Sequence, residues 1–192
     1  MIEDCTAIIL AGGNSSRMGQ DKAMLPFNGT PLLQSVIAVV QPLFGKTMVS
    51  VNAPRAEIAL PQICDRQTGM GPLAGLVSAL EQVTTPWTFV VACDMPFVAP
   101  AVIVQLAALR GDHQAVVPRI AGYPQPLLAF YATGCLPLLQ ARLAGGDRSL
   151  MGALKLLNVR YAEEGELTAS SPRSFIDLDT PQDVARAEGM MQ

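Results

Sequence analysis

A short run near the start of the chain combines a glycine-rich loop with two positive charges. Residues 10–22 read LAGGNSSRMGQDK, and they follow an apolar stretch, residues 6–10, that we expect to be a buried strand. Glycine lets backbone N–H groups approach an anion closely, while Arg17 and Lys22 supply the fixed charge that adjacent phosphates require. The run therefore predicts a phosphate-binding loop. The alternative interpretation is a glycine turn with solvated charges.

The loop does not match two well-known phosphate-binding motifs. A P-loop requires Gly-Lys-Ser/Thr after its spacer residues, and the dinucleotide fingerprint requires Gly-x-Gly-x-x-Gly. The run instead resembles the signature of nucleotidyltransferases that couple a nucleoside triphosphate to a phosphorylated acceptor. Its form LAGGxSxRMGxDK is most similar to that of the molybdenum cofactor guanylyltransferases (MobA-like nucleotidyltransferases). The segment Cys93-Asp94-Met95-Pro96 resembles the metal-binding segment of the same family.

The resemblance extends over residues 10–183 and implies a magnesium-dependent enzyme, with manganese as the alternative metal. Such an enzyme transfers GMP from GTP to the phosphate of Mo-molybdopterin and releases pyrophosphate. Molybdopterin-insertion and molybdoenzyme-maturation proteins are candidate partners that would receive the product. The resemblance assigns Arg148 to the pterin phosphate, and it assigns nucleotide contacts to Leu10, Ala11, Gly12, Gly13, Lys22, Asn52, Asp65, Gly71 and Asp94.

The chemistry of such a transfer agrees with the residue types that are present. Attack by a phosphate oxygen on the α-phosphorus of a triphosphate brings two polyanions together, so the catalyst must neutralise charge and align the groups. The nucleophile needs no base, because a terminal phosphate has a second pKa of about 6. The single histidine, His113, follows Gly111-Asp112, where we expect a surface loop. We therefore assign catalysis to Arg17, Lys22 and Asp94.

Carboxylates that follow apolar stretches are candidate metal ligands. Mg²⁺ is commonly bound by one or two carboxylates together with substrate phosphates, and Asp94 follows an apolar strand. Asp179 is the second candidate ligand, with Asp177 as its competitor, although the family often carries Asn at these two positions. The alternatives are that Asp94 caps the helix expected near Pro100 and that Asp179 caps the last helix.

Base recognition is open to more than one interpretation. Guanine offers N1–H and N2–H₂ donors, so carboxylate or carbonyl acceptors would select it. Asn52 and Asp65 could provide such contacts, or they could stabilise turns. The rival enzymes are a molybdopterin cytidylyltransferase and a sugar- or alcohol-phosphate nucleotidyltransferase. A rival from another class is a non-catalytic module that carries a nucleotide or the finished cofactor.

Composition limits the class of protein. The chain has 192 residues, 50% of them hydrophobic, which suits one compact domain spanning residues 1–192. A net charge of −3 leaves no broad basic face for nucleic acid. The acidic start and the short apolar runs indicate neither a secretory signal nor a membrane span, so we expect a cytoplasmic protein. The four cysteines lack C-x-x-C spacing, so we expect buried, reduced thiols.

Helix and strand signals alternate along the chain. The pattern predicts a Rossmann-like nucleotidyltransferase fold of the α/β class, in which helices cover both faces of a mostly parallel, doubly wound sheet in three layers. Ligands in such folds bind at the carboxyl ends of the strands, where we expect the Gly12 loop, Asn52, Asp65, Asp94 and Asp177. We expect strands at residues 6–10, 46–51, 87–92, 115–117, 127–131 and 175–178. We expect helices capped at Thr30 and Thr180, and others starting at Gly71-Pro72 and Pro100 and covering 135–143 and 150–157.

Overall fold

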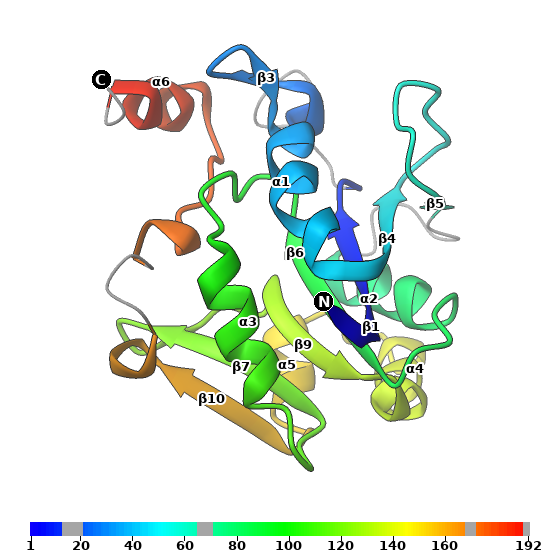
Figure 1. Cartoon of the computed structure of the whole chain (residues 1–192). Helices are drawn as coiled ribbons and strands as arrows, with labels where there is room; N and C mark the ends of the chain where they lie inside the picture. The colour runs from blue at the N-terminus through cyan, green and yellow to red at the C-terminus, as the bar shows by residue number, and fades with distance from the viewer. Residues whose placement is uncertain (13–20, 65–70, 168–171, 190–192) are drawn as a thin grey trace.

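The computed structural model describes residues 1–12, 21–64, 71–167 and 172–189 (Figure 1). Its central feature is an eight-stranded sheet with the strand order β10-β7-β9-β6-β1-β4-β5, and β8 pairs with β7. The strands are β1 (Ile2–Leu10), β4 (Phe44–Val51), β5 (Gln62–Cys64), β6 (Trp87–Ala92), β7 (Ala115–Ile120), β8 (Tyr123–Pro124), β9 (Leu128–Ala132) and β10 (Val159–Glu163).

Most of the strand pairs are parallel, as the alternation of helices and strands predicts. β1 pairs in parallel with β4 and β6, β4 with β5, and β10 with β7. Among the described strands, β9 runs antiparallel to both of its neighbours, β6 and β7, and the short β8 runs antiparallel to β7. The predicted doubly wound α/β sheet is therefore confirmed.

Helices cover both faces of the sheet, so the fold has three layers (Figure 1). Alternate residues of a strand face opposite sides, and in β1 Ala7 and Ile9 pack in one core cluster while Ile8 packs in the other. The first cluster contains residues of α1 (Leu32–Val40) and α3 (Pro100–Ala108). The second contains residues of α2 (Pro72–Leu80), α4 (Leu136–Ala144) and α5 (Leu150–Leu154).

A third, smaller core cluster joins residues 27–32 to the C-terminal segment. It contains Phe27 and Leu32, near a small hairpin of β2 (Pro26–Phe27) and β3 (Thr30–Pro31), together with Leu178 and Ala187. Ala187 belongs to the last helix, α6 (Pro181–Gly189), which lies beside β3 in Figure 1. The packing of this cluster holds the C-terminal segment over the carboxyl edge of the sheet.

Several predicted elements differ from the structure. The strand predicted at residues 175–178 is not formed: Phe175 ends a 3-10 turn (Pro172–Phe175), and Ile176 and Leu178 pack in the third cluster rather than along a strand edge. Thr30 does not cap α1, because Thr30 and Pro31 pair with β2 and the helix starts at Leu32. The short β5 and the charged edge strand β10 were not predicted from the sequence.

Within the ranges that the structure describes, no helix combines the length and the apolar composition that crossing a bilayer would require.

Candidate active site

The candidate site lies where β1 and β6 end side by side. The two strands are parallel, with Leu10 in register with Ala92, so Ala11 and Cys93 both leave the sheet at its carboxyl edge. The N–H of Cys93 donates to the carbonyl of Leu10 at 3.0 Å, and the N–H of Ala11 donates to the carbonyl of Ser50 at 2.8 Å. Ala11, which follows β1, and Cys93, which precedes Asp94, are thus both hydrogen-bonded to neighbouring strands of the same sheet.

Lys22 joins the two predicted metal ligands. Its Nζ lies 2.5 Å from Oδ2 of Asp94 and 2.5 Å from Oδ1 of Asp179. Lys22 and Asp94 are only 18% and 17% exposed, whereas Asp179 is 54% exposed. The ammonium group therefore sits between one sheltered and one exposed carboxylate.

A short 3-10 turn, Lys22–Met24, presents the lysine. Asp21 is its N-cap, and Oδ1 of Asp21 accepts the N–H of Ala23 at 3.1 Å. The N–H of Leu25 then donates to the carbonyl of Lys22 at 3.2 Å, while Ala23 is buried in the core. Because both ends of the turn are hydrogen-bonded, the direction of the Lys22 side chain is constrained.

The C-terminal segment brings Asp179 to the site. The N–H of Leu178 donates to the carbonyl of Asp94 at 3.0 Å, and the Leu178 side chain is 1% exposed in the third cluster. The start of α6 is capped by Thr180 and Asp183, since Oγ1 of Thr180 accepts the N–H of Asp183 at 3.2 Å and Oδ2 of Asp183 accepts the N–H of Thr180 at 2.8 Å. Asp179 is therefore not the side chain that caps this helix.

Asp94 does not cap a helix either. The N-cap of α3 is Ala99, which makes no side-chain capping bond. The N–H of Ala99 instead donates to Oγ of Ser174 at 3.1 Å. The capping interpretation of Asp94 is thus wrong, and its carboxylate instead pairs with Lys22.

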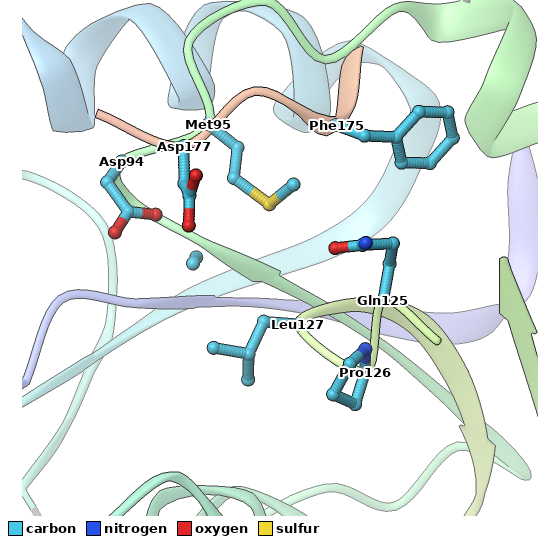
Figure 2. Close-up of a pocket in the computed structure, with 8 residues that line it drawn as sticks. Asp94, Met95, Gln125, Pro126, Leu127, Phe175 and Asp177 are labelled. Carbon is cyan, nitrogen blue, oxygen red and sulfur yellow. The ribbon is translucent and has the colours of Figure 1, made fainter. Parts of the chain in front are cut away.

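A pocket opens next to this ion-pair group (Figure 2). Asp94 and Asp177 lie beside each other on one side of it, and Gln125, Pro126 and Leu127 lie on the other. Phe175, Met95 and Ala92 complete its lining. Polar groups on an apolar floor are typical of a small-molecule site.

The charges of the site influence one another. Burial acts to lower the pKa of Lys22, but the hydrogen bonds and charges of Asp179 and Asp94 outweigh it and raise the pKa, so the ammonium stays charged. Asp177 is exposed, yet partial desolvation and the nearby charges of Asp179 and Asp94 raise its pKa. Among the described residues of the site, the carboxylates therefore outnumber the cation Lys22, which favours a further cation at this place.

The donor set fits a cation that is shared with a substrate. A cage of three or more His, Cys, Asp or Glu side chains is absent from the described part of the chain. Two carboxylates, however, already face one small positive group, the Lys22 ammonium, which stands in for a cation. Mg²⁺ is often held by one or two carboxylates plus phosphate oxygens and waters, so Asp94 and Asp179 fit such an ion.

Other predicted site residues lie around the same edge. Leu10 ends β1, Ala11 and Gly12 follow it, and Asn52 is exposed directly after β4. Gly71 is the N-cap of α2 with a φ of 82°, a conformation that favours glycine. The carbonyl of Arg148 is 3.7 Å from where a Cβ on Gly71 would lie, so the Arg148 loop contacts the start of α2. Gly13, Arg17 and Asp65 lie outside the described residues.

An ion pair close to the site was not predicted from the sequence. Arg55, in the loop after β4, forms an ion pair with Asp21, the residue that caps the Lys22 turn. No motif marks such a pair, because it joins two separate loops. His113, in contrast, lies before β7 at the opposite end of the sheet, where its Nδ1 is 3.1 Å from the carbonyl of Arg110.

Sequence comparison gives a consistent family assignment. A family described as "MobA-like NTP transferase domain" matches residues 7–160. The "Molybdenum cofactor guanylyltransferase" of Pseudomonas putida is 36% identical over 186 residues, which cover 92% of this chain and 94% of that protein. The "Probable molybdenum cofactor guanylyltransferase" of Chloroflexus aggregans is 35% identical over 191 residues, covering 93% of this chain and 91% of the relative.

Solved structures share the same fold. The crystal structure of Molybdopterin-guanine dinucleotide biosynthesis protein A from Archaeoglobus fulgidus superposes with a TM-score of 0.85 at 28% identity, covering 97% of this chain and 98% of the other. The 2-C-methyl-D-erythritol 4-phosphate cytidylyltransferase of Thermus thermophilus superposes with a TM-score of 0.71 at 16% identity, covering 96% and 97%. The similarity to the cytidylyltransferase, at 16% identity, concerns the fold alone.

Proposed function

Because this chain belongs to the MobA-like NTP transferase domain family, we propose that it is a molybdenum cofactor guanylyltransferase. It would transfer GMP from GTP to the phosphate of Mo-molybdopterin and release pyrophosphate. The observation that carries this proposal is the convergence of Lys22, Asp94 and Asp179 at the carboxyl edge of β1 and β6. A lysine and two carboxylates are the groups that a phosphate-to-phosphate transfer requires.

In the proposed reaction an oxygen of the molybdopterin phosphate attacks the α-phosphorus of GTP. A new P–O bond to the α-phosphorus forms as the bond from the α-phosphorus to the bridging oxygen of pyrophosphate breaks, and the electron pair of the broken bond leaves with the pyrophosphate. Lys22 neutralises the triphosphate and the charge that develops on the leaving group, and Arg17 is proposed to share this role. No side chain has to remove a proton, because the attacking phosphate is largely dianionic at neutral pH.

Asp94 and Asp179 are proposed to hold a divalent cation, Mg²⁺ or alternatively Mn²⁺, which would neutralise phosphate oxygens when it is bound. The family is one of nucleotidyltransferases, which are generally metal-dependent. In the structure Lys22 pairs with both carboxylates and offsets one of their two negative charges. Binding of the nucleotide would let the lysine contact phosphate while the carboxylates keep a positive partner.

The nucleoside is proposed to lie along Leu10, Ala11, Gly12, Gly13, Asn52, Asp65 and Gly71, with the acceptor on the other side of Asp94. The pocket supports this division, because it extends from Asp94, the first proposed metal ligand, to Gln125, Pro126 and Leu127, which precede β9. Arg148 is proposed to bind the acceptor phosphate because residues 146–150 resemble the family segment near the pterin phosphate. Its planar guanidinium suits a phosphate.

The proposal covers residues 1–192 as one nucleotidyltransferase domain in the cytoplasm. Nucleotide and molybdopterin are its substrates, and molybdopterin-insertion and molybdoenzyme-maturation proteins are its proposed partners. The related enzyme activities, transfer of CMP to molybdopterin or of a nucleotide to a sugar or alcohol phosphate, are the alternatives within the same chemistry.

The first test asks whether the protein is a catalyst. We would incubate it with GTP, Mg²⁺ and Mo-molybdopterin and measure pyrophosphate, with parallel samples that lack the pterin or the metal. The proposal expects pyrophosphate only in the complete mixture, at more than one equivalent per protein. Binding of GTP without pyrophosphate release would instead support the carrier module.

A further inference from the structure

An ion pair links the loop after β4 to the turn that presents Lys22. Arg55 Nη1 contacts Oδ2 of Asp21, and the two side chains are 19% and 38% exposed. Asp21 is the neighbour of Lys22 and caps its turn through the N–H of Ala23. The Asp21 carboxylate therefore caps the lysine turn with Oδ1 and forms an ion pair with Arg55 through Oδ2.

Arg55 is itself held firmly to the sheet. Its N–H donates to Oε1 of Gln62 at 2.8 Å, and its carbonyl accepts Nε2 of Gln62 at 2.7 Å. The same amide also donates to the carbonyl of Ile58 at 3.2 Å. Gln62 begins the edge strand β5, in register with Val49 of β4, so the backbone of Arg55 is hydrogen-bonded to the edge of the sheet.

The pair lies between two parts of the proposed nucleotide site. Asn52, at the start of the Arg55 loop, is on the nucleoside side, and Lys22 is on the triphosphate side. We propose that Arg55 is a positioning residue that couples these two parts through Asp21; this inference rests on the proposed function. Arg55 fixes the Lys22 turn in its binding orientation and neutralises a carboxylate that would otherwise repel the triphosphate.

The charges of Arg55 and Asp21 predict which of the two single substitutions should weaken GTP binding more. Removing Arg55 leaves the Asp21 carboxylate without its cation, close to the place where a polyanion binds. Removing the Asp21 charge costs the orientation of the turn but adds no repulsion. We therefore expect Arg55→Gln to weaken GTP binding about tenfold or more and Asp21→Asn to weaken it less.

The test is a double-mutant cycle on GTP affinity, measured by calorimetry in Mg²⁺ for the parent, Arg55→Gln, Asp21→Asn and the double variant. We expect the double variant to resemble Asp21→Asn, because arginine has nothing to neutralise once the carboxylate is gone. Arg55→Lys, which keeps the charge, should recover part of the affinity. Additive effects, or a double variant weaker than both single variants, would overturn the coupling.

Arg110 provides a matched control. Its Nη1 lies 2.9 Å from Oδ1 of Asp4, and the two side chains are 16% and 53% exposed, so the pair resembles Arg55–Asp21 in burial. It lies at the amino end of β1, away from the site. Arg110→Gln should lower the melting temperature without changing GTP affinity. If Arg110→Gln lost as much GTP affinity as Arg55→Gln, the effect of Arg55 would be one of general stability rather than of positioning.

Two further readouts separate this inference from the proposed function. In steady-state assays Arg55→Gln should raise KM for GTP more than it lowers kcat, because binding orientation is what it changes. Amide exchange at Ala23 needs no substrate, and it should be faster in Arg55→Gln than in the parent or Arg110→Gln. If the parent releases no pyrophosphate, the proposed function fails, while unchanged exchange at Ala23 would refute the positioning role separately.

Discussion

Nζ of Lys22 lies 2.5 Å from Oδ2 of Asp94, although the two residues are 72 positions apart in the sequence. The contact joins the glycine-rich loop to the strand that carries the proposed metal ligand. It places a cation and an anion where a triphosphate and its divalent ion would both bind. Because Lys22 is proposed to contact the triphosphate and Asp94 the divalent ion, substitutions of the two residues should have different effects.

Lys22→Ala should weaken GTP binding and slow pyrophosphate release while the fold is retained. Losing a charge-assisted contact to phosphate costs about 1.5–3 kcal/mol, or roughly ten- to a hundredfold. GTP titration and initial rates measure the effect, and circular dichroism checks the fold. The exposed Lys155 offers a control, because Lys155→Ala removes the same charge elsewhere. Unchanged affinity and turnover in Lys22→Ala would contradict its role.

Asp94→Asn should reduce the chemical step more than it reduces GTP binding, since the charge near the leaving pyrophosphate grows in the transition state. We expect a single-turnover rate at least about 100-fold lower at saturating Mg²⁺. Asp112→Asn, at an exposed position far from the pocket, is the matched control. A rate equal to that of the parent would remove Asp94 from the metal site.

Asp179→Asn should be much milder than Asp94→Asn. An amide oxygen can still bind a divalent ion, and Asp179 is the more exposed of the two carboxylates. Asp179→Ala, which removes the oxygen, should raise the Mg²⁺ concentration needed for half-maximal rate by about tenfold. If the Mg²⁺ dependence of Asp179→Ala matches that of the parent, Asp177 becomes the better candidate for the second ligand.

The cysteines should differ sharply in reactivity. Burial raises the pKa of Cys5 and of Cys93 to about 12 and that of Cys135 to about 11, whereas Cys64 is exposed. A raised pKa keeps a thiol neutral below that pH, so at pH 8 only about one in a thousand of these three thiols, or fewer, is ionised. Iodoacetamide should label Cys64 alone in the folded protein and all four thiols in denaturant. Rapid labelling of Cys93 in the folded state would contradict this.

The strand that positions Asp94 could be predicted from sequence. Residues 87–92 form an apolar run bounded by Pro86 and Cys93-Asp94, and the structure gives β6 the same bounds. The Lys22 loop was likewise marked by its glycines and charges. The sequence thus identified both partners of the central ion pair, but it gave no sign that they pair, because that contact depends on the fold.

Other features depended on tertiary packing. The alternation of residues 175–178 resembles a strand, yet Leu178 is buried against α1 and α6, and the segment passes over Asp94 instead. Arg55 sits in a loop without a motif, so its pairing with Asp21 could not be inferred from spacing. These are long-range contacts, which local patterns do not encode.

The most direct test of the central claim is product formation from competing nucleotides. The protein, Mg²⁺ and Mo-molybdopterin would be incubated with GTP, CTP, ATP or UTP, and pyrophosphate and the mass of the pterin product would be measured. We expect GTP to be used with a preference as large as roughly 10⁴-fold, because acceptors aimed at guanine N1–H and N2–H₂ stay unpaired with other bases. The pterin should gain the mass of GMP. A product carrying CMP, or pyrophosphate release that does not depend on the pterin, would contradict the assignment.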